Sequence, residues 1–222
     1  MTLSQNWQVS PNDLFEMGPI VPVLVIKNVE DALPIAEALL AADIKVLEVT
    51  LRTPAAIDVI RKIAEALPEA VVGAGTVTNR ELLQQSADAG AKFAISPGLT
   101  KDLLQAGKEG DIALIPGISS ISELMDGIDA GYDHFKFFPA EASGGVKAIQ
   151  SIGGPFPDIR FCPTGGININ NINDYLALKN VACCGGSWLV SDEIVNNKDW
   201  GKITQLAREA LAHVKLATST RV

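Results

Sequence analysis

The stretch that decides the fold is Val46-Leu47-Glu48-Val49-Thr50-Leu51-Arg52, a short run of apolar and β-branched residues that ends in a charge. β-Branched residues favour strands. The segment that follows, Ala55 to Leu67, has apolar and charged residues at helical spacing. Together they predict one strand and one helix joined by a short polar junction.

The same unit recurs along the whole chain. The apolar runs begin every 20 to 26 residues or so, which leaves room for one strand and one crossover helix, as parallel pairing requires. Eight strands are therefore predicted: Ile20 to Ile26, Val46 to Leu51, Val71 to Ala74, Phe93 to Ser96, Ala113 to Ile115, Phe135 to Phe138, Ile159 to Cys162 and Val181 to Cys184.

Helix start and stop signals fall between these runs. Thr78-x-x-Glu81 and Ser120-x-x-Glu123 have the capping-box pattern, and Ser10-Pro11 predicts a short helix before the first strand. Glycines stand where three helices are expected to end, at Gly90, Gly110 and Gly131. Further helical spacing covers Ala32 to Leu40 and Trp200 to Lys215.

Eight strand-helix units allow a closed (β/α)₈ barrel or an open doubly wound sheet. Polar and glycine-rich residues follow many of the strands, as they do where barrel active sites form. An open sheet is expected to gather its ligand residues at one switch point, and the junction Lys27-Asn28-Val29-Glu30 lacks a G-x-G-x-x-G pattern. We therefore predict a (β/α)₈ TIM barrel with a short N-terminal helix, forming one domain over residues 1–222.

Composition limits the classes of function. The chain has 222 residues, 47% of them hydrophobic, and a formal net charge of −8, which disfavours partners such as nucleic acid or an anionic membrane. No apolar stretch reaches the ~20 residues of a membrane span, and Met1 to Trp7 lacks the features of a signal peptide. The cysteines, Cys162, Cys183 and Cys184, have no metal-ligand spacing. We expect a cytoplasmic protein with buried, unpaired thiols.

Lys136 interrupts the aromatic run from Phe135 to Phe138. Lysine is rarely buried, and a buried amine that loses its charge is a nucleophile that forms Schiff bases with carbonyls. The alternative is a lysine on a solvated strand edge, or one whose stem lies along apolar surface while its amine stays in water.

Side chains alternate between the two faces of a strand, so Glu48, Thr50 and Arg52 share one face and the neighbouring apolar residues share the other. If the apolar set faces the helices, Glu48 points into the barrel and Arg52 toward its mouth. The same alternation places Lys136 with Phe138, so Glu48 and Lys136 could meet inside the barrel. A purely structural ion pair, Glu48 with Lys136 or with Arg52, remains an alternative.

Two glycine pairs follow the seventh and eighth predicted strands: Gly165-Gly166 after Thr164, and Gly185-Gly186 before Ser187. Barrel enzymes often bind phosphate with these two loops, where glycines let backbone N–H groups approach an anion. Tight turns alone would also explain the glycines.

Two other junctions carry residues that a ligand could meet. Thr76 follows Gly73-Ala74-Gly75 and could offer its hydroxyl to a ligand or simply cap the junction. Ser96-Pro97-Gly98 and Pro116-Gly117 have turn chemistry and are interpreted as structural walls.

Other chemistries find little support in the sequence. His134 and His213 have no spacing that suggests a Ser-His-Asp or Cys-His device, and no cluster of acidic residues and histidines has metal-ligand spacing. We therefore expect an enzyme without a cofactor or a metal.

Six motifs in order resemble the class I 2-keto-3-deoxy-6-phosphogluconate (KDPG) aldolase family of the Entner–Doudoroff pathway, which also resembles 4-hydroxy-2-oxoglutarate (KHG) aldolase. The resemblance runs from about Pro19 to Lys215. The motifs are Leu47-Glu48-Val49-Thr50-Leu51-Arg52, Gly73-Ala74-Gly75-Thr76, Ile95-Ser96-Pro97-Gly98, Phe135-Lys136-Phe137-Phe138-Pro139-Ala140, Pro163-Thr164-Gly165-Gly166 and Gly185-Gly186-Ser187-Trp188.

The resemblance implies a homotrimeric (β/α)₈ lyase that cleaves a phosphorylated 2-keto acid to pyruvate and glyceraldehyde 3-phosphate. It implies that Lys136 forms the Schiff base and that Glu48 carries protons. It also places the pyruvyl carboxylate on Arg52 and Thr76, near Thr164, with Phe138 beside the imine and Pro97 in the same pocket. The phosphate is then expected at Gly165, Gly166, Gly186 and Ser187.

Two other functions remain open from the sequence. One is a sugar-phosphate binding barrel without catalytic activity, in which Lys136 and Glu48 only form an ion pair. The other is a barrel isomerase or epimerase that uses Glu48 as its base and Lys136 as an electrophile.

Overall fold

The structure is a computed structural model that describes residues 7–219. The expectation about a signal peptide concerns mainly Met1 to Asn6, which lie outside the described residues. Within residues 7–219, no helix has both the length and the apolar character needed to cross a membrane.

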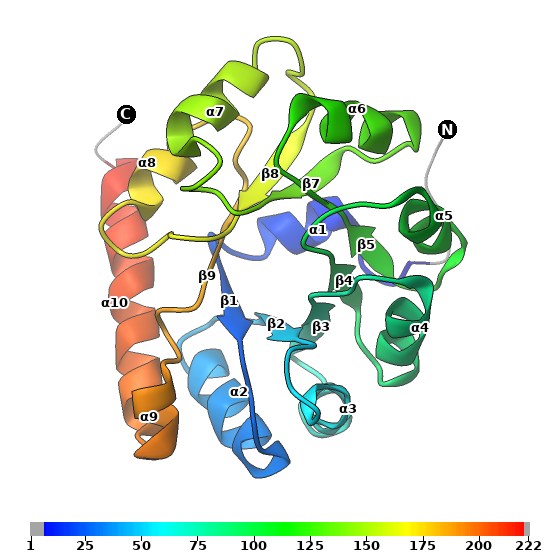
Figure 1. The fold of residues 1–222 in the computed structure, drawn as a ribbon. Helices are drawn as coiled ribbons and strands as arrows, with labels where there is room; N and C mark the ends of the chain where they lie inside the picture. The colour runs from blue at the N-terminus through cyan, green and yellow to red at the C-terminus, as the bar shows by residue number, and fades with distance from the viewer. Residues whose placement is uncertain (1–6, 220–222) are drawn as a thin grey trace.

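The strands are all parallel and form two sheets (Figure 1). One has the order β5-β4-β3-β2-β1-β9 and the other the order β6-β7-β8. Isolated bridges join Phe161 to Val181 and Thr164 to Gly185, so the β8 segment contacts the β9 segment. The strands are β1 (Ile20–Leu24), β2 (Val46–Thr50), β3 (Val71–Gly75), β4 (Phe93–Ile95), β5 (Ala113–Ile115), β6 (Gly117–Ile118), β7 (His134–Phe137), β8 (Arg160–Pro163) and β9 (Cys184–Gly186).

Helices surround the strands, and α1 lies across the end of the strands that is far from the viewer in Figure 1. The predicted α/β architecture with a short N-terminal helix is confirmed. The helices are α1 (Pro11–Glu16), the 3₁₀ turn η1 (Val29–Asp31), α2 (Ala32–Leu40), α3 (Ala56–Ala66), α4 (Arg80–Asp88), α5 (Lys101–Glu109), α6 (Ile121–Asp129), α7 (Gly145–Ile152), α8 (Ile172–Leu176), α9 (Asp192–Asn196) and α10 (Trp200–Ser219).

Alternation along the strands sorts side chains as predicted. In β2, Leu47 and Val49 join the large apolar cluster between strands and helices, whereas Val46 belongs to a separate cluster enclosed by the strands. Leu14 and Phe15 of α1 pack into that inner cluster, so α1 closes one end of it. The opposite end of the inner cluster, at the C-terminal ends of the strands, carries polar side chains.

Most helix boundaries match the predictions. The Ser10 hydroxyl accepts the Asp13 N–H at the start of α1, and Ser120 and Glu123 form a complete capping box on α6. The box predicted from Thr78 and Glu81 is wrong. Asn79 caps α4 instead, because its side chain accepts the Leu82 N–H.

One strand prediction also needs correction, and one short strand was not predicted. The run Val181 to Cys184 contributes only a bridge at Val181, and the paired strand β9 begins at Cys184. The fifth predicted strand ends at Ile115, as β5 does, and Pro116 separates it from a further short strand, β6, in which Gly117 pairs with Lys136 of β7. Proline lacks the N–H that a ladder needs, which accounts for the interruption.

Candidate active site

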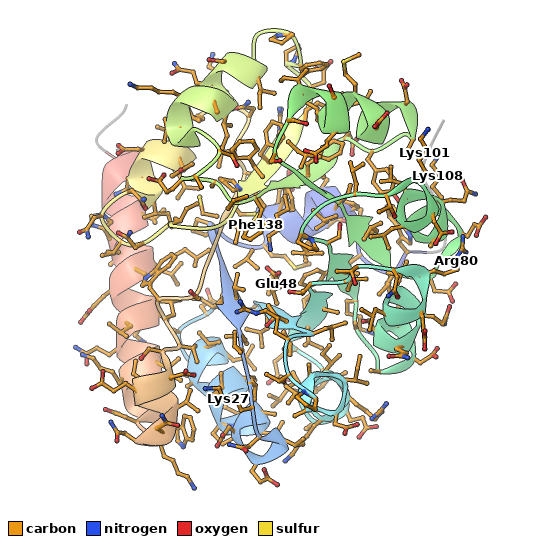
Figure 2. The ribbon with its side chains drawn as sticks, in the orientation of Figure 1. Lys27, Glu48, Arg80, Lys101, Lys108 and Phe138 are labelled. Atoms are coloured by element: carbon orange, nitrogen blue, oxygen red, sulfur yellow. The ribbon has the colours of Figure 1, made fainter. Side chains whose placement is uncertain are left out.

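A cavity of about 350 Å³ opens at the C-terminal ends of the strands. Figure 2 shows Glu48 and Phe138 near the centre of the molecule, inside the circle of helices. The cavity is lined by Val23, Thr50, Arg52, Thr76, Pro97, Lys136, Phe138, Thr164, Gly165, Gly166, Ile167, Gly186 and Ser187.

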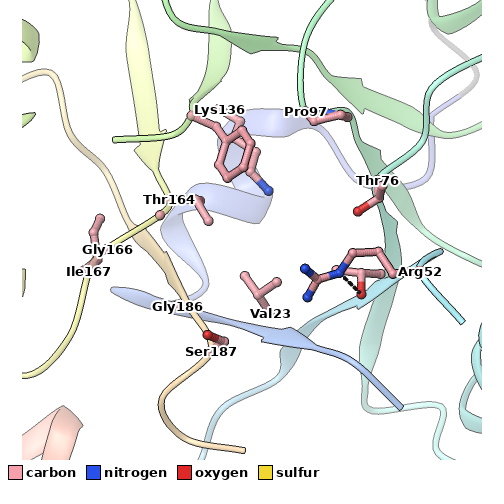
Figure 3. Close-up of a pocket in the computed structure, with 13 residues that line it drawn as sticks. Val23, Arg52, Thr76, Pro97, Lys136, Thr164, Gly166, Ile167, Gly186 and Ser187 are labelled. Atoms are coloured by element: carbon pink, nitrogen blue, oxygen red, sulfur yellow. Dashed lines mark hydrogen bonds between the residues drawn. The ribbon is translucent and has the colours of Figure 1, made fainter. Parts of the chain in front are cut away.

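Lys136 and Glu48 meet at the inner side of this cavity. The Lys136 Nζ donates to Glu48 Oε1 at 3.0 Å, and the two residues are only 6% and 1% exposed. The amine also lies 5.4 Å from the centroid of the Phe138 ring. Lys136 therefore faces an anion and an aromatic surface at once, and Figure 3 shows its amine directed into the open space.

The Glu48 side chain has space in the interior because the β3 residue beside it is Gly75. A Cβ atom at Gly75 would lie 2.3 Å from Glu48 Oε1, too close for any real side chain. Gly75 thus leaves a slot for the carboxylate. Gly73 serves a different contact, because a Cβ there would lie 2.5 Å from the Phe93 ring. The space beside these two glycines is therefore used by Phe93 and Glu48 rather than by a ligand.

Arg52 extends from the end of β2 into the cavity (Figure 3). The Arg52 Nε donates to Thr50 Oγ1 at 3.3 Å, and the Thr50 hydroxyl donates in turn to the Leu24 carbonyl at 2.9 Å. Thr50 is 2% exposed, so this connection is fixed on the inner face of the sheet. It leaves both terminal nitrogens of the guanidinium for a planar anion.

Thr76 and Thr164 bring hydroxyl groups to the same space. Thr76 has φ 61°, a left-handed conformation that is uncommon for threonine, and its hydroxyl points toward Arg52 in Figure 3. Thr164 is 6% exposed, and its buried Oγ1 has no hydrogen-bond partner. A buried hydroxyl without a partner is costly, so Thr164 is suited to bind a ligand.

Gly165, Gly166 and Gly186 line the cavity, and Figure 3 shows Gly166 and Gly186 on the side opposite Arg52. Gly165 and Gly166 have φ of 102° and 79°, which side chains rarely adopt. A Cβ at Gly186 would lie 1.7 Å from the Trp188 ring. Gly165 and Gly166 therefore require glycine because of their backbone conformation, and Gly186 because the Trp188 ring packs against it.

The cavity contains most of the predicted site. All nine residues predicted to bind substrate line it with Lys136, and Glu48 lies beneath the surface in contact with that lysine. The sequence analysis missed Val23, Thr50 and Ile167. Thr50 shares the strand face of Glu48 and Arg52, a signal that could have identified it. Pro97, which the turn pattern suggested was structural, lines the cavity.

His134 and the cysteines do not line the cavity, although Cys162 of β8 lies beside Lys136 in the β7–β8 ladder. His134 Nδ1 bonds to the Asp133 carboxylate at 2.7 Å, and its ring packs edge-on against Phe15 of α1. A hydrogen bond to Cys162 and burial raise the pKa of the Cys183 thiol. The predicted buried, unpaired thiols are confirmed, because all three cysteines are free and buried.

A sequence comparison decides the family. Residues 12–206 match the family described as KDPG and KHG aldolase. The chain belongs to the KDPG and KHG aldolase family. The resemblance that the six motifs carried is therefore confirmed.

Relatives in this family align over almost their full lengths. The chain is 65% identical over 210 residues to the 2-dehydro-3-deoxy-phosphogluconate aldolase of Pseudoalteromonas atlantica, covering 95% of this chain and 98% of the relative. It is 58% identical over 212 residues to the KHG/KDPG aldolase of Escherichia coli K12, covering 96% and 100%.

A solved structure of an aldolase of this family has the same fold. The KDPG aldolase of Legionella pneumophila superposes with a TM-score of 0.91 at 51% identity, covering 92% of this chain and 100% of that one. That crystal structure captured pyruvate at low pH as a covalent carbinolamine intermediate.

Proposed function

We propose that this protein is a class I aldolase that cleaves 2-dehydro-3-deoxy-6-phosphogluconate to pyruvate and D-glyceraldehyde 3-phosphate. The observation that carries the proposal is the buried Lys136 amine, 3.0 Å from the Glu48 carboxylate and facing a cavity that also contains Arg52. Family membership and the pyruvate adduct of the Legionella pneumophila enzyme support it.

The proposed reaction begins at the substrate ketone. The unprotonated Lys136 amine attacks C2, and loss of water from the resulting carbinolamine gives a protonated imine. Glu48 can accept the amine proton because its Oε1 lies 3.0 Å from Nζ.

The imine then acts as an electron sink. A base removes the proton of the C4 hydroxyl, the C3–C4 bond breaks, and its electron pair moves to the imine and forms a neutral enamine. The aldehyde product leaves. Glu48 returns a proton to C3 of the enamine, and water hydrolyses the imine to free pyruvate and Lys136.

Other residues of the cavity hold the two ends of the substrate. Arg52 binds the pyruvyl carboxylate by paired hydrogen bonds, with the Thr76 and Thr164 hydroxyls beside it. The phosphate is held by backbone N–H groups of Gly165, Gly166 and Gly186 and by the Ser187 side of the cavity. Phe138 and Pro97 exclude water next to the imine.

A second substrate follows from the same chemistry. 4-Hydroxy-2-oxoglutarate carries the same C2 ketone and C4 hydroxyl, and its cleavage would give pyruvate and glyoxylate. The dual name of the Escherichia coli relative supports this second activity.

The proposal includes the form of the whole protein. We propose one domain over residues 1–222 in which the strands close into an eight-stranded (β/α)₈ barrel, supported by the bridges between the β8 and β9 segments and by the single residue between β5 and β6. We also propose a homotrimer, on the family resemblance, and a cytoplasmic location, in keeping with three free cysteines.

Trapping of the imine tests the function. Incubation with pyruvate and borohydride should reduce the adduct onto Lys136, and peptide mass analysis locates it. Lys136→Met should lose the adduct and about a thousandfold or more in kcat/KM. Lys27→Met is the matched control, because Lys27 is exposed and paired with Asp192. It should keep both.

The same experiment separates the alternatives. A sugar-phosphate binding barrel would give neither adduct nor turnover. A barrel isomerase with Glu48 as its base would turn over a sugar phosphate without a trappable imine. Either result would overturn the aldolase assignment.

A further inference from the structure

The loop that follows β7 packs against the loop that follows β8, which carries the glycine pair. The Glu141 N–H donates to the Gly165 carbonyl at 3.1 Å, and the Ala140 N–H donates to the Thr164 carbonyl at 2.8 Å. These two bonds place Glu141 directly beside Gly165-Gly166. The position of the glycine pair therefore depends on what holds Glu141.

The Glu141 side chain covers Gly166. A Cβ atom built on Gly166 would lie 2.5 Å from Glu141 Cγ, so the glycine is required for this contact as well as for its φ of 79°. The Asn171 side-chain amide also donates to the Gly166 carbonyl at 3.0 Å. Gly166 is thus contacted by both Glu141 and Asn171.

A buried tyrosine fixes the far end of Glu141. The Tyr175 hydroxyl, from α8, donates to Glu141 Oε1, and Tyr175 is 0% exposed. Gly145, at the start of α7, makes room for the pair, since its Cβ would lie 3.2 Å from the hydroxyl and 3.3 Å from the carboxylate. Burial, and then the hydrogen bond to Glu141, raise the pKa of Tyr175, so it remains a donor at neutral pH.

We propose that the Tyr175–Glu141 pair is a strut that positions Gly165-Gly166 for the phosphate and so sets the preference for phosphorylated substrates. This inference rests on the proposed function. Glu141 and Tyr175 do not line the cavity, so they are positioning residues rather than ligands. They act on the end of the substrate that is remote from the imine.

The Tyr175–Glu141 pair should affect phosphate binding electrostatically as well as sterically. A carboxylate competes with phosphate for backbone N–H groups, because both are anionic acceptors. The Tyr175 hydroxyl donates a hydrogen bond to the Glu141 carboxylate and so fixes its orientation. Without the hydroxyl, Glu141 is free to turn toward the N–H groups of the same glycine pair.

The test compares two substrates. The quantity measured is kcat/KM for the phosphorylated substrate divided by kcat/KM for 4-hydroxy-2-oxoglutarate. Tyr175→Phe should lower this ratio about tenfold, through KM for the phosphorylated substrate, because only that substrate uses the glycine pair. Pyruvate trapping on Lys136 should continue in this variant.

Tyr132→Phe is the matched control. Tyr132 is 3% exposed, and its hydroxyl donates to the Leu104 carbonyl at 2.8 Å, away from the cavity. Both variants lose one buried hydroxyl, so a general loss of stability would affect them alike. The substrate ratio of Tyr132→Phe should stay within about twofold of the wild type.

Glu141 gives an independent pair of variants. Glu141→Gln keeps an oxygen that can accept from Tyr175 and should retain the wild-type ratio. Glu141→Ala removes the packing against Gly166 and should lower the ratio, but less than Tyr175→Phe does, because no carboxylate is left to compete with phosphate. An unchanged ratio in Tyr175→Phe, or equal ratios in the two Glu141 variants, would overturn the strut. A wild-type protein that forms no imine with pyruvate would instead overturn the proposed function.

Discussion

At the scale of single residues, the site combines charged side chains whose burial is energetically unfavourable with glycines that leave space for them. Glu48 is 1% exposed and needs both its bond to Lys136 and the absence of a side chain at Gly75. An unpaired buried carboxylate would be strongly destabilising. The Glu48–Lys136 pair therefore depends on residues of β2, β3 and β7, and the sequence of any one of these strands does not predict it.

Thr50 determines the direction of Arg52. Its single hydroxyl proton is donated to the Leu24 carbonyl, so the oxygen is left to accept from Arg52 Nε. Thr50→Val keeps the shape but loses both bonds. It should raise KM for the 2-keto acid about tenfold with a smaller change in kcat, and lower stability by about 1 kcal/mol.

Thr50→Ser is the matched variant because it keeps the hydroxyl. It should stay within about twofold of the wild type in KM. The pyruvate concentration that gives half-maximal imine trapping should follow the same order. Equal KM values for the serine and valine variants would show that the hydroxyl does not position Arg52.

Strand alternation predicted much of the site at this scale. It placed Glu48 and Arg52 on the inner face of β2 and Lys136 with Phe138, as the structure shows. It could not reveal Tyr175 and Glu141. Those two lie 34 residues apart, one in an irregular loop and one on a short helix, and no periodicity relates them.

At the scale of elements, the helix boundaries depend on which of two neighbouring polar residues becomes the cap. Thr78 and Asn79 both suit the role. Asn79 is the residue with an extended backbone, at φ −157° and ψ 171°, whose side chain accepts the Leu82 N–H. Similarly, the apolar run Val181 to Cys184 indicates a buried segment but does not indicate at which residue the strand hydrogen bonds begin. The local sequence pattern therefore predicts that an element exists better than it predicts the element's first and last residues.

The capping box on α6 should make stability depend on pH. Burial alone raises the pKa of Glu123, but hydrogen bonds from Ser119 and Ser120 outweigh it, and the net pKa is lowered from its usual 4.5. A carboxyl group whose pKa is lower in the folded state stabilises at pH above its unfolded value and stops doing so as pH falls through its folded value.

Glu123→Gln tests this dependence. The wild type should be more stable than this variant by about 0.5 kcal/mol at pH 7, because solvent screens the partly exposed carboxylate, and the difference should shrink as the pH falls below about 4.5. Glu81→Gln is the control, since Glu81 lies in the first turn of α4 outside a capping box. Thermal unfolding from pH 7 to pH 3 measures both. A gap that is constant with pH would contradict the role of the charge.

At the scale of the whole molecule, the exposed apolar side chains indicate where the subunits of the proposed trimer would meet. Among the described residues, the large hydrophobic side chains that are most exposed are Met125 at 54%, Ile121 at 43% and Met17 at 40%. Ile121 and Met125 are four residues apart on α6, so they occupy one face of that helix. A contiguous apolar face is typical of subunit contacts.

Met125→Lys should therefore dissociate the proposed trimer. The substitution puts a charge into the contact but costs little in a single subunit, because the side chain is already half exposed. Light scattering should give three times the 23.5 kDa of one chain for the wild type and one chain for the variant. Met17→Lys, which changes the other exposed methionine near α1, should remain trimeric. A Met125→Lys trimer would place the contact on another face, and a monomeric wild type would contradict the trimer itself.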